Sequence, residues 1–253
     1  MANSKIALVT GANRGLGKDM ALNLAQAGLD VVITYRGNRA EAESVVQTIE
    51  GLGRRAIALQ LDVGKTAGFA AFTDNLVATL RREWDTDKID FLVNNAGIGI
   101  NAPISQTAEE QFDELMSVHF KGVYFLTQRM LPLMRDHGAI VNVSSGLTRF
   151  ALPGYSAYAS MKGAIETFTK YLAKELGSRG IRANLVAPGA IDTDFNKASL
   201  DGHPGLREFI GAQTALGRIG VAEDIGSVVA FLCSDSARWV NAQRLEASGG
   251  MFL

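Results

Sequence analysis

Short apolar runs alternate along the chain with longer stretches in which apolar positions recur at helical spacing. Continuous apolar, β-branched runs are typical of strands that are buried on both faces of a parallel sheet. Several of the longer stretches end at glycine, as helices often do. The pattern predicts an α/β fold, namely a doubly wound, Rossmann-type parallel sheet of about seven strands with helices on both faces.

The expected elements follow one another without a linker, a repeat or a low-complexity segment. Strands are expected at 5–10, 31–35, 56–61, 89–93, 139–143, 182–186 and 243–247. Helices are expected at 14–27, 39–52, 67–82, 109–135, 157–176 and 222–233. The stretch 190–220 has no clear period, and a loop of that length is usually functional or mobile. We expect one dinucleotide-binding catalytic domain over 1–253, with a substrate loop around 190–220.

Composition and charge exclude several classes of protein. The 253 residues are 47% hydrophobic and 20% charged, which excludes a disordered or fibrous chain. The 25 basic residues are balanced by 26 acidic ones, so no nucleic-acid partner is expected. No uncharged apolar run approaches the ~18 residues that span a membrane, so no membrane partner is expected.

The cysteine and histidine content narrows the picture further. The single cysteine, Cys233, excludes an intrachain disulfide and fits a reducing, cytoplasmic location. The three histidines, His119, His137 and His203, lack the spacing of metal ligands, so no metal site is expected.

A glycine-rich turn follows the first expected strand. It reads Thr-Gly-Ala-Asn-Arg-Gly-Leu-Gly over 10–17 and precedes a helix. Missing side chains let the backbone approach a pyrophosphate, and a helix N-terminus supplies N–H donors and partial positive charge. The spacing differs from G-x-G-x-x-G, and a tight turn without a ligand is the alternative. The context favours a dinucleotide site with contacts from Gly11, Asn13, Arg14, Gly15, Leu16 and Gly17.

The end of the second expected strand indicates which nicotinamide cofactor is used. An acidic residue there would bind the ribose 2′-hydroxyl, but the segment reads Thr34-Tyr35-Arg36. The guanidinium groups of Arg14 and Arg36 are suited to a 2′-phosphate, unless both are solvated surface side chains. We therefore expect NADP(H) in preference to NAD(H).

An acid–base pair opens the helix expected at 157–176. Tyr158 and Lys162 are four residues apart and share a helix face, where a nearby ammonium stabilises a phenolate. Such a pair is common by chance, but Ser145 follows the strand at 139–143 and therefore lies at the same sheet edge as the glycine turn. Ser144 is the neighbouring alternative, and Tyr155 has alanine, not lysine, four residues later.

Together these motifs resemble the short-chain dehydrogenase/reductase family over essentially the whole chain. The resemblance rests on 10–17, Asp62-Val63, 94–97, Ser145, Tyr158 with Lys162, Pro188-Gly189 and 248–250. It implies a seven-stranded parallel sheet, a dimer or tetramer, and hydride transfer between a nicotinamide and a carbonyl or alcohol carbon.

Residue roles follow from the resemblance position by position. It implies that Tyr158 is the general acid in reduction, that Ser145 polarises the carbonyl, and that Lys162 lowers the tyrosine pKa and binds the nicotinamide ribose. The further cofactor contacts that it implies are Asp62, Val63, Asn95, Ala96, Gly97, Pro188, Gly189, Ile191 and Thr193, with Tyr158 and Lys162.

One position departs from the family pattern. Where the family commonly has an asparagine that completes a proton relay, this chain has His119. His119 is either a catalytic residue that relays protons, with an unperturbed pKa near ~6.5, or a packed helix histidine.

We therefore expect an NADP-dependent carbonyl reductase of the ketone or 3-oxoacyl type, reversible as an alcohol dehydrogenase. Its partners would be a small-molecule carbonyl or alcohol substrate and further copies of itself, as a homotetramer or dimer. A 3-oxoacyl thioester, a keto sugar, a cyclic ketone and a xenobiotic ketone all remain open. Arg149 either meets an anionic substrate group or is solvated. The alternatives are a non-catalytic nucleotide-sensing protein and a dehydratase or epimerase on the same scaffold.

Overall fold

Seven parallel strands form one sheet in this computed structural model, which describes residues 4–253 apart from the side chain of Ala198. The strand order is β3-β2-β1-β4-β5-β6-β7. The strands are β1 (Ile6–Val9), β2 (Asp30–Tyr35), β3 (Ala56–Gln60), β4 (Ile89–Asn94), β5 (Met134–Val143), β6 (Arg182–Pro188) and β7 (Arg244–Ala247). The order reverses between β1 and β4, and ligands of open α/β sheets bind beyond the carboxyl ends of strands at such a point.

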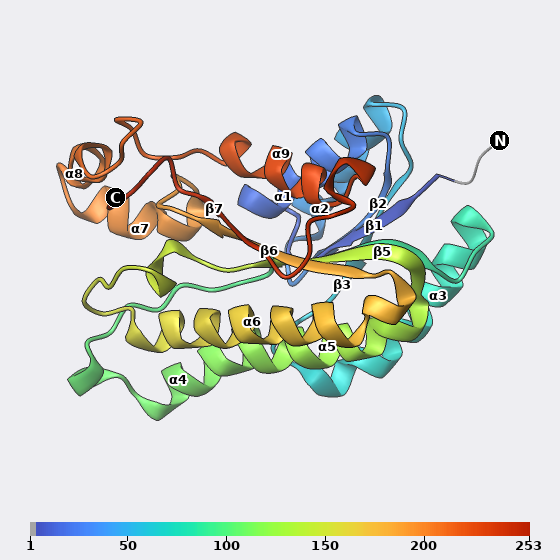
Figure 1. Cartoon of the computed structure of the whole chain (residues 1–253), viewed down its shortest axis with the longest axis horizontal. Coiled ribbons are helices and arrows are strands. Elements are labelled where there is room, and N and C mark those ends of the chain that lie inside the picture. Colours follow the sequence, from blue (N-terminus) through green and yellow to red (C-terminus); the bar gives the residue numbers. More distant parts are fainter. Residues whose placement is uncertain (1–3) are drawn as a thin grey trace.

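Helices cover both faces of the sheet (Figure 1). They are α1 (Gly15–Gln26), α2 (Arg39–Gly51), α3 (Phe69–Trp84), α4 (Glu109–Met116), α5 (Gly122–Met130), α6 (Ser156–Glu175), α7 (Asp194–Gly202), α8 (Leu206–Ala212) and α9 (Glu223–Leu232). Helices α1, α2 and α9 lie on one face, and α3 to α6 lie on the other. The predicted doubly wound fold is confirmed.

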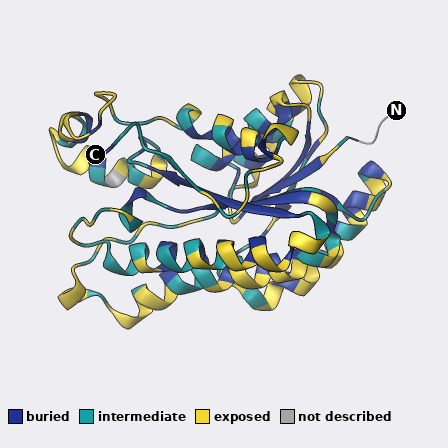
Figure 2. Cartoon of the chain, viewed as in Figure 1, coloured by how far each residue is buried: buried dark blue, intermediate teal, exposed yellow. Residues whose placement is uncertain are grey.

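Two hydrophobic cores share the sheet because side chains alternate along each strand. In β1, Ala7 and Val9 pack into the core under α1, α2 and α9, whereas Ile6 and Leu8 pack into the core over α3, α5 and α6. Figure 2 shows the strands as a buried layer between two helical layers whose outer faces are exposed. The continuous apolar runs of the sequence are therefore strands that are buried on both faces.

The segment expected to be helical at 109–135 is helical as far as Leu133, but it is not one regular α-helix. It is α4, then a π-helical turn at Ser117–Lys121, then α5, then a 3₁₀ turn at Leu131–Leu133. Pro132 lies in the last turn, where its missing N–H ends the helix. Strand β5 then begins at Met134, which pairs with Ile89, so β5 also starts earlier than expected.

The expectation of an irregular loop at 190–220 is also wrong in part, because this stretch contains α7 and α8. Each helix is short, with 9 and 7 residues, so neither gives a clear apolar period. They lie together with the C-terminal end of the chain at one end of the molecule (Figure 1). None of the helices in residues 4–253 is long and apolar enough to cross a membrane, and no group of metal-ligating side chains is found among those residues.

Asp19 is a buried carboxylate at the contact between α1 and α9. Its Oδ2 accepts the N–H of Gly226 at 2.9 Å, and its Oδ1 accepts the side-chain amide of Asn23 at 3.1 Å. Burial raises the pKa of Asp19 to about 6, although the two hydrogen bonds oppose the shift. The ionised form is therefore disfavoured in the folded protein.

We expect Asp19→Asn to stabilise the protein more at pH 8 than at pH 4. Because the folded-state pKa of Asp19 lies above the ordinary value of 3.8, its favourable contribution is fully present below 3.8 and is lost as the pH rises through about 6. Asparagine keeps an acceptor for Gly226 but does not titrate. Urea unfolding at both pH values should show the variant gaining about 1–3 kcal/mol relative to wild type at the higher pH. A difference that is independent of pH would contradict this.

Candidate active site

A cavity of about 910 Å³ lies along the carboxyl edge of the sheet, at the reversal of strand order. Its volume lies within the usual range for small-molecule sites. It is lined by every site residue predicted from the sequence: Gly11, Asn13, Arg14, Gly15, Leu16, Gly17, Arg36, Asp62, Val63, Asn95, Ala96, Gly97, His119, Ser145, Tyr158, Lys162, Pro188, Gly189, Ile191 and Thr193. Segments from most of the chain therefore meet at one cavity.

The glycine turn is fastened to the end of β4. Thr10 Oγ1 accepts the N–H groups of Asn95 and Ala96, both at 3.0 Å, and the Asn95 side chain donates to Thr10 O at 2.9 Å. A Cβ on Gly17 would lie 2.3 Å from Gly11 O, and one on Gly11 would lie 2.9 Å from Ala96 Cα. No side chain larger than hydrogen is tolerated at these two positions without a shift of the backbone.

The same turn fits a pyrophosphate. Helix α1 begins at Gly15 without a side-chain cap, so its first N–H groups are free to meet a ligand. The space beside Gly15 is open, with only Thr193 Cβ at 3.8 Å from an added methyl position. Uncapped N–H groups next to open space at a helix N-terminus are the arrangement that binds phosphate in dinucleotide sites.

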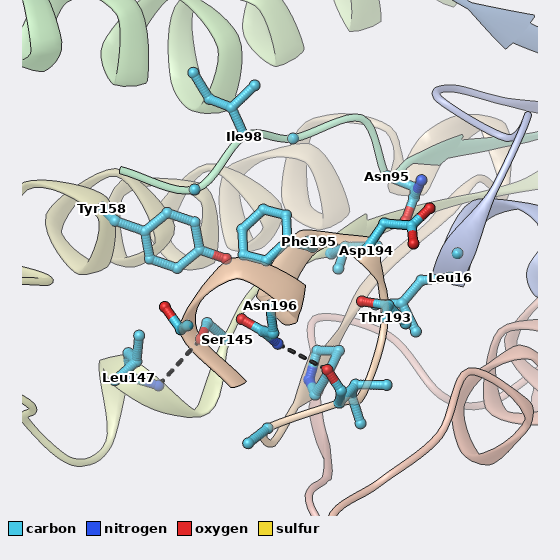
Figure 3. Close-up of a pocket in the computed structure, with 18 of the residues that line it drawn as sticks. Leu16, Asn95, Ile98, Ser145, Leu147, Tyr158, Thr193, Asp194, Phe195 and Asn196 are labelled. Atoms are coloured by element: carbon cyan, nitrogen blue, oxygen red, sulfur yellow. Dashed lines mark hydrogen bonds between the residues drawn. The ribbon is translucent and has the colours of Figure 1, made fainter. Parts of the chain in front are cut away.

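Ser145, Tyr158 and Lys162 line the same cavity, and Figure 3 shows Ser145 and Tyr158 in it. The hydroxyl of Ser145 lies near that of Tyr158. Ser145 Oγ also accepts the N–H of Leu147 at 3.2 Å, which fixes the turn after β5. Lys162 Nζ donates to Val143 O at 2.8 Å and lies 5.6 Å from the centre of the Tyr158 ring.

Burial controls the ionisation of this cluster. Burial raises the pKa of Tyr158 above its usual range, against the opposing effect of the nearby Ser145 hydroxyl. Burial also lowers the pKa of Lys162 to about 7. The role of Lys162 in lowering the tyrosine pKa stays a prediction, because burial of the phenol is the larger effect among the protein's own groups. The phenol is held in its protonated form.

The contacts of Ser144 and Arg244 distinguish Ser144 from Ser145. Ser144 is buried, and its Oγ donates to Glu166 at 2.8 Å. Glu166 also accepts from Arg244 at 2.8 Å, and Arg244 donates to Ser145 O at 3.2 Å. Ser144 is thereby committed to a structural hydrogen bond, while the hydroxyl of Ser145 lies near that of Tyr158.

His119 lies in the π-helical turn beside the cluster. Its side chain is buried, with Nε2 at 2.7 Å from Ile98 O, and its ring meets that of Tyr158 edge-on with centroids 5.0 Å apart. Burial and the charge of Lys162 lower its pKa to about 3. The N–H of Ile98 also lies 3.2 Å from Nε2, so both backbone groups of Ile98 meet this ring nitrogen. This neutral imidazole is held to the backbone of Ile98, which does not favour a relay through a charged histidine.

The substrate side of the cavity is mostly apolar. Phe195 of α7 lies with its ring centre 6.2 Å from that of Tyr158. A third, smaller core joins α7 and α8 to the C-terminal residues Met251 and Phe252. The remaining apolar lining residues are Ile98, Leu147, Phe150, Leu152, Leu200, Leu206, Phe209, Ile210 and Ile219.

The part of the cavity wall that contains Met251 and Phe252, here called the C-terminal wall, was not predicted. Its contacts account for the position of Arg149. Arg149 is exposed to solvent, as one of the two alternatives expected, and its guanidinium is also engaged in contacts within the protein. Its guanidinium binds Glu246 at 2.8 Å and donates to the backbone carbonyls of Met251 and Phe252. Phe150 then packs on Phe252 with ring centres 4.8 Å apart. Sequence patterns gave no signal for this wall, because its residues are brought together only by the fold.

A family model described as enoyl-(acyl carrier protein) reductase matches residues 11–252. The chain is 36% identical over 255 residues to the 3-oxoacyl-[acyl-carrier-protein] reductase FabG of Staphylococcus aureus, covering 100% of both chains. The chain belongs to the short-chain dehydrogenase/reductase family. This confirms the resemblance seen in the motifs and makes the protein an oxidoreductase.

Solved structures of other short-chain dehydrogenases/reductases superimpose closely on this one. The angucycline C-6 ketoreductase LanV, determined with bound NADP, is 37% identical with a TM-score of 0.93, over 98% of this chain and 95% of its own. The promiscuous reductase LugOII, which catalyses keto-reduction at C1 during lugdunomycin biosynthesis, is 36% identical with a TM-score of 0.93, over 100% of both chains.

We expect His119→Asn to leave the pH dependence of turnover unchanged between about pH 5 and about pH 9, because a neutral histidine does not titrate there. Loss of its contact with Ile98 should lower kcat by less than about tenfold. The measurement is the pH profile of kcat/KM for wild type and variant. His203→Asn, at an exposed histidine that also lines the cavity, is the matched control. A wild-type inflection near pH 6.5 that disappears in His119→Asn would refute this assignment.

Proposed function

We propose that this chain is an NADPH-dependent ketoreductase that acts on a bulky, mostly apolar ketone and runs in reverse as an alcohol dehydrogenase. The observation that carries the proposal is that Ser145, Tyr158 and Lys162 line one cavity together with the glycine turn and the apolar wall. The two ketoreductases that superimpose on the chain, one of them with bound NADP, support the same assignment.

The residues divide the chemistry between them. NADPH, when bound, supplies the hydride for the carbonyl carbon. Ser145 Oγ binds the substrate oxygen, and the Tyr158 hydroxyl gives its proton to the alkoxide that forms. Lys162 stabilises the phenolate left behind and binds the nicotinamide ribose. His119 holds the Ile98 backbone, and through it the wall beside the reacting carbon.

The remaining cavity residues hold the cofactor. Helix α1 and the glycine turn, with Gly11, Asn13, Gly15, Leu16 and Gly17, bind the pyrophosphate. Arg14 and Arg36 bind the 2′-phosphate; Arg14 pairs with Asp194 at 3.6 Å, but both side chains are exposed and the pair is weak. Asp62 and Val63 line the adenine site, Asn95, Ala96 and Gly97 lie beside the cofactor, and Pro188, Gly189, Ile191 and Thr193 border the nicotinamide.

A 3-oxoacyl thioester is the second candidate substrate, favoured by the similarity to the Staphylococcus aureus reductase over its full length. The phenylalanines of the cavity favour the bulky ketone: Phe195 contacts Gly99 and approaches Tyr158, and Phe150 and Phe252 pack on each other. A keto sugar fits this wall poorly, because its hydroxyl groups would be buried without partners.

The oligomeric state, the number of domains and the location are also part of this proposal. We propose a homo-oligomer, a dimer or tetramer, because α5 and α6 expose Tyr124, Phe125 and Tyr171 on the face away from the sheet. We propose one catalytic domain, since both large cores share the sheet. A cytoplasmic location stays a prediction, supported by Cys233, whose pKa burial raises to about 12 and whose thiol is therefore unreactive.

The function is tested by NADPH oxidation over a panel of polycyclic aromatic ketones, 3-oxoacyl thioesters and keto sugars. We expect turnover of the polycyclic ketones, and Tyr158→Phe should lower kcat at least ~1000-fold while the Kd for NADPH stays within about threefold. Tyr155→Phe is the matched control and should keep most of the activity. NADPH binding without turnover on the panel would favour a nucleotide sensor, and turnover without net NADPH change would favour a dehydratase or epimerase.

The cofactor preference is tested by Arg36→Ala. We expect its Kd for NADPH to rise at least about tenfold and its Kd for NADH to change less than about threefold, because a charge-assisted contact to the 2′-phosphate is lost. Fluorescence titration of the reduced nicotinamide gives both values. Arg39→Ala is the control, since Arg39 is exposed and paired with Glu43. A tenfold wild-type preference for NADH would refute the NADPH assignment.

A further inference from the structure

An acidic side chain lies at the nucleotide end of the cavity, where the sequence predicted none. Glu41 is in the first turn of α2 and lines the cavity with Arg14 and Arg36. Its Oε2 accepts the side-chain amide of Asn13 at 2.7 Å, and its backbone N–H donates to Asn38 Oδ1 at 3.3 Å. The carboxylate is therefore held against the residue that directly precedes Arg14.

The charge of Glu41 is not neutralised by a basic side chain. Within residues 4–253, Glu41 makes no ion pair, whereas Glu43, two positions further along the helix, pairs with Arg39 at 2.7 Å. Glu41 is also half-buried, so water screens its charge less than it would screen that of an exposed carboxylate. One unpaired negative charge is thus fixed in the same part of the cavity as the two arginines.

A ligand with a 2′-phosphate brings further negative charge to this place. Its attraction to Arg14 and Arg36 is then opposed by repulsion from Glu41, while a ligand with a 2′-hydroxyl feels no such repulsion and is able to donate to a carboxylate. Glu41 also offsets the partial positive charge at the N-terminus of α2, which would otherwise favour the phosphate.

We infer that Glu41 is a specificity-determining residue of the cofactor site, where its carboxylate weakens the preference for a 2′-phosphorylated dinucleotide over its 2′-hydroxyl counterpart. The inference rests on the proposed function only in placing the adenosine ribose beside Arg14 and Arg36. The chain therefore combines two arginines that favour NADPH with one carboxylate that favours NADH.

Glu41→Gln removes the negative charge of the side chain and preserves its hydrogen bonds. Glutamine keeps an oxygen to accept from Asn13 and leaves the backbone contact with Asn38 intact, so the turn and the helix end should not move. Glu43→Gln removes the same charge from the same helix at an exposed site that does not line the cavity, and it is the matched control.

The experiment measures the Kd of NADPH and NADH for wild type, Glu41→Gln and Glu43→Gln by fluorescence titration at low and high salt. Adenosine 2′,5′-bisphosphate and AMP serve as probes without a nicotinamide. In Glu41→Gln, the ratio Kd(NADH)/Kd(NADPH) should rise about five- to tenfold at low salt, mainly through tighter NADPH binding. The gain should shrink to less than about twofold near 0.5 M salt, and Glu43→Gln should match wild type.

An unchanged ratio in Glu41→Gln, or an equal change for both cofactors, would overturn the inference. That result leaves the proposed function standing if wild type prefers NADPH and Arg36→Ala removes the preference. A wild type that prefers NADH, with a ratio that still shifts in Glu41→Gln, supports the role of Glu41 and refutes the NADPH assignment instead.

Discussion

The hydrogen bonds between Thr10 and the start of the segment after β4 are the contact on which the site depends. Thr10 Oγ1 accepts two successive N–H groups, of Asn95 and Ala96, and Asn95 returns a bond to Thr10 O. These bonds join the carboxyl ends of β1 and β4, the two strands between which the sheet order reverses. They hold the glycine turn against the segment that follows β4, and both line the cavity.

A second polar network sets the catalytic helix on the sheet. Asn142 of β5 accepts from Asn94 of β4 at 2.8 Å and donates to Thr169 of α6 at 2.9 Å, and all three side chains are buried. Buried amides that are fully paired fix one arrangement, because any slip leaves a polar group without a partner. The register of α6 against β5 is thereby fixed, and with it the meeting of Tyr158 and Ser145.

The sequence was informative where function depends on residues that are close in the chain or at strand ends. The glycine turn, Ser145 and the Tyr158–Lys162 pair all belong to such local patterns, and the structure brings them to one cavity. Glu41 was missed because its carboxylate enters the cavity only through a contact with Asn13, across two elements. The effect of burial on the pKa of Tyr158 was also missed, because burial is a property of the folded state.

The C-terminal wall shows how the same limit applies to the substrate side. Arg149 stands four residues after Ser145, but its partners are Glu246 of β7 and the carbonyls of Met251 and Phe252. The segments 213–216 and 249–252 also pair with each other through backbone hydrogen bonds. Arg149 therefore ties the segment that carries Ser145 to the last residues of the chain and, through them, to α8. The shape of the apolar wall and the position of the catalytic hydroxyl are set by one group of contacts, so a change in the size of Phe252 acts on substrate fit beside Ser145.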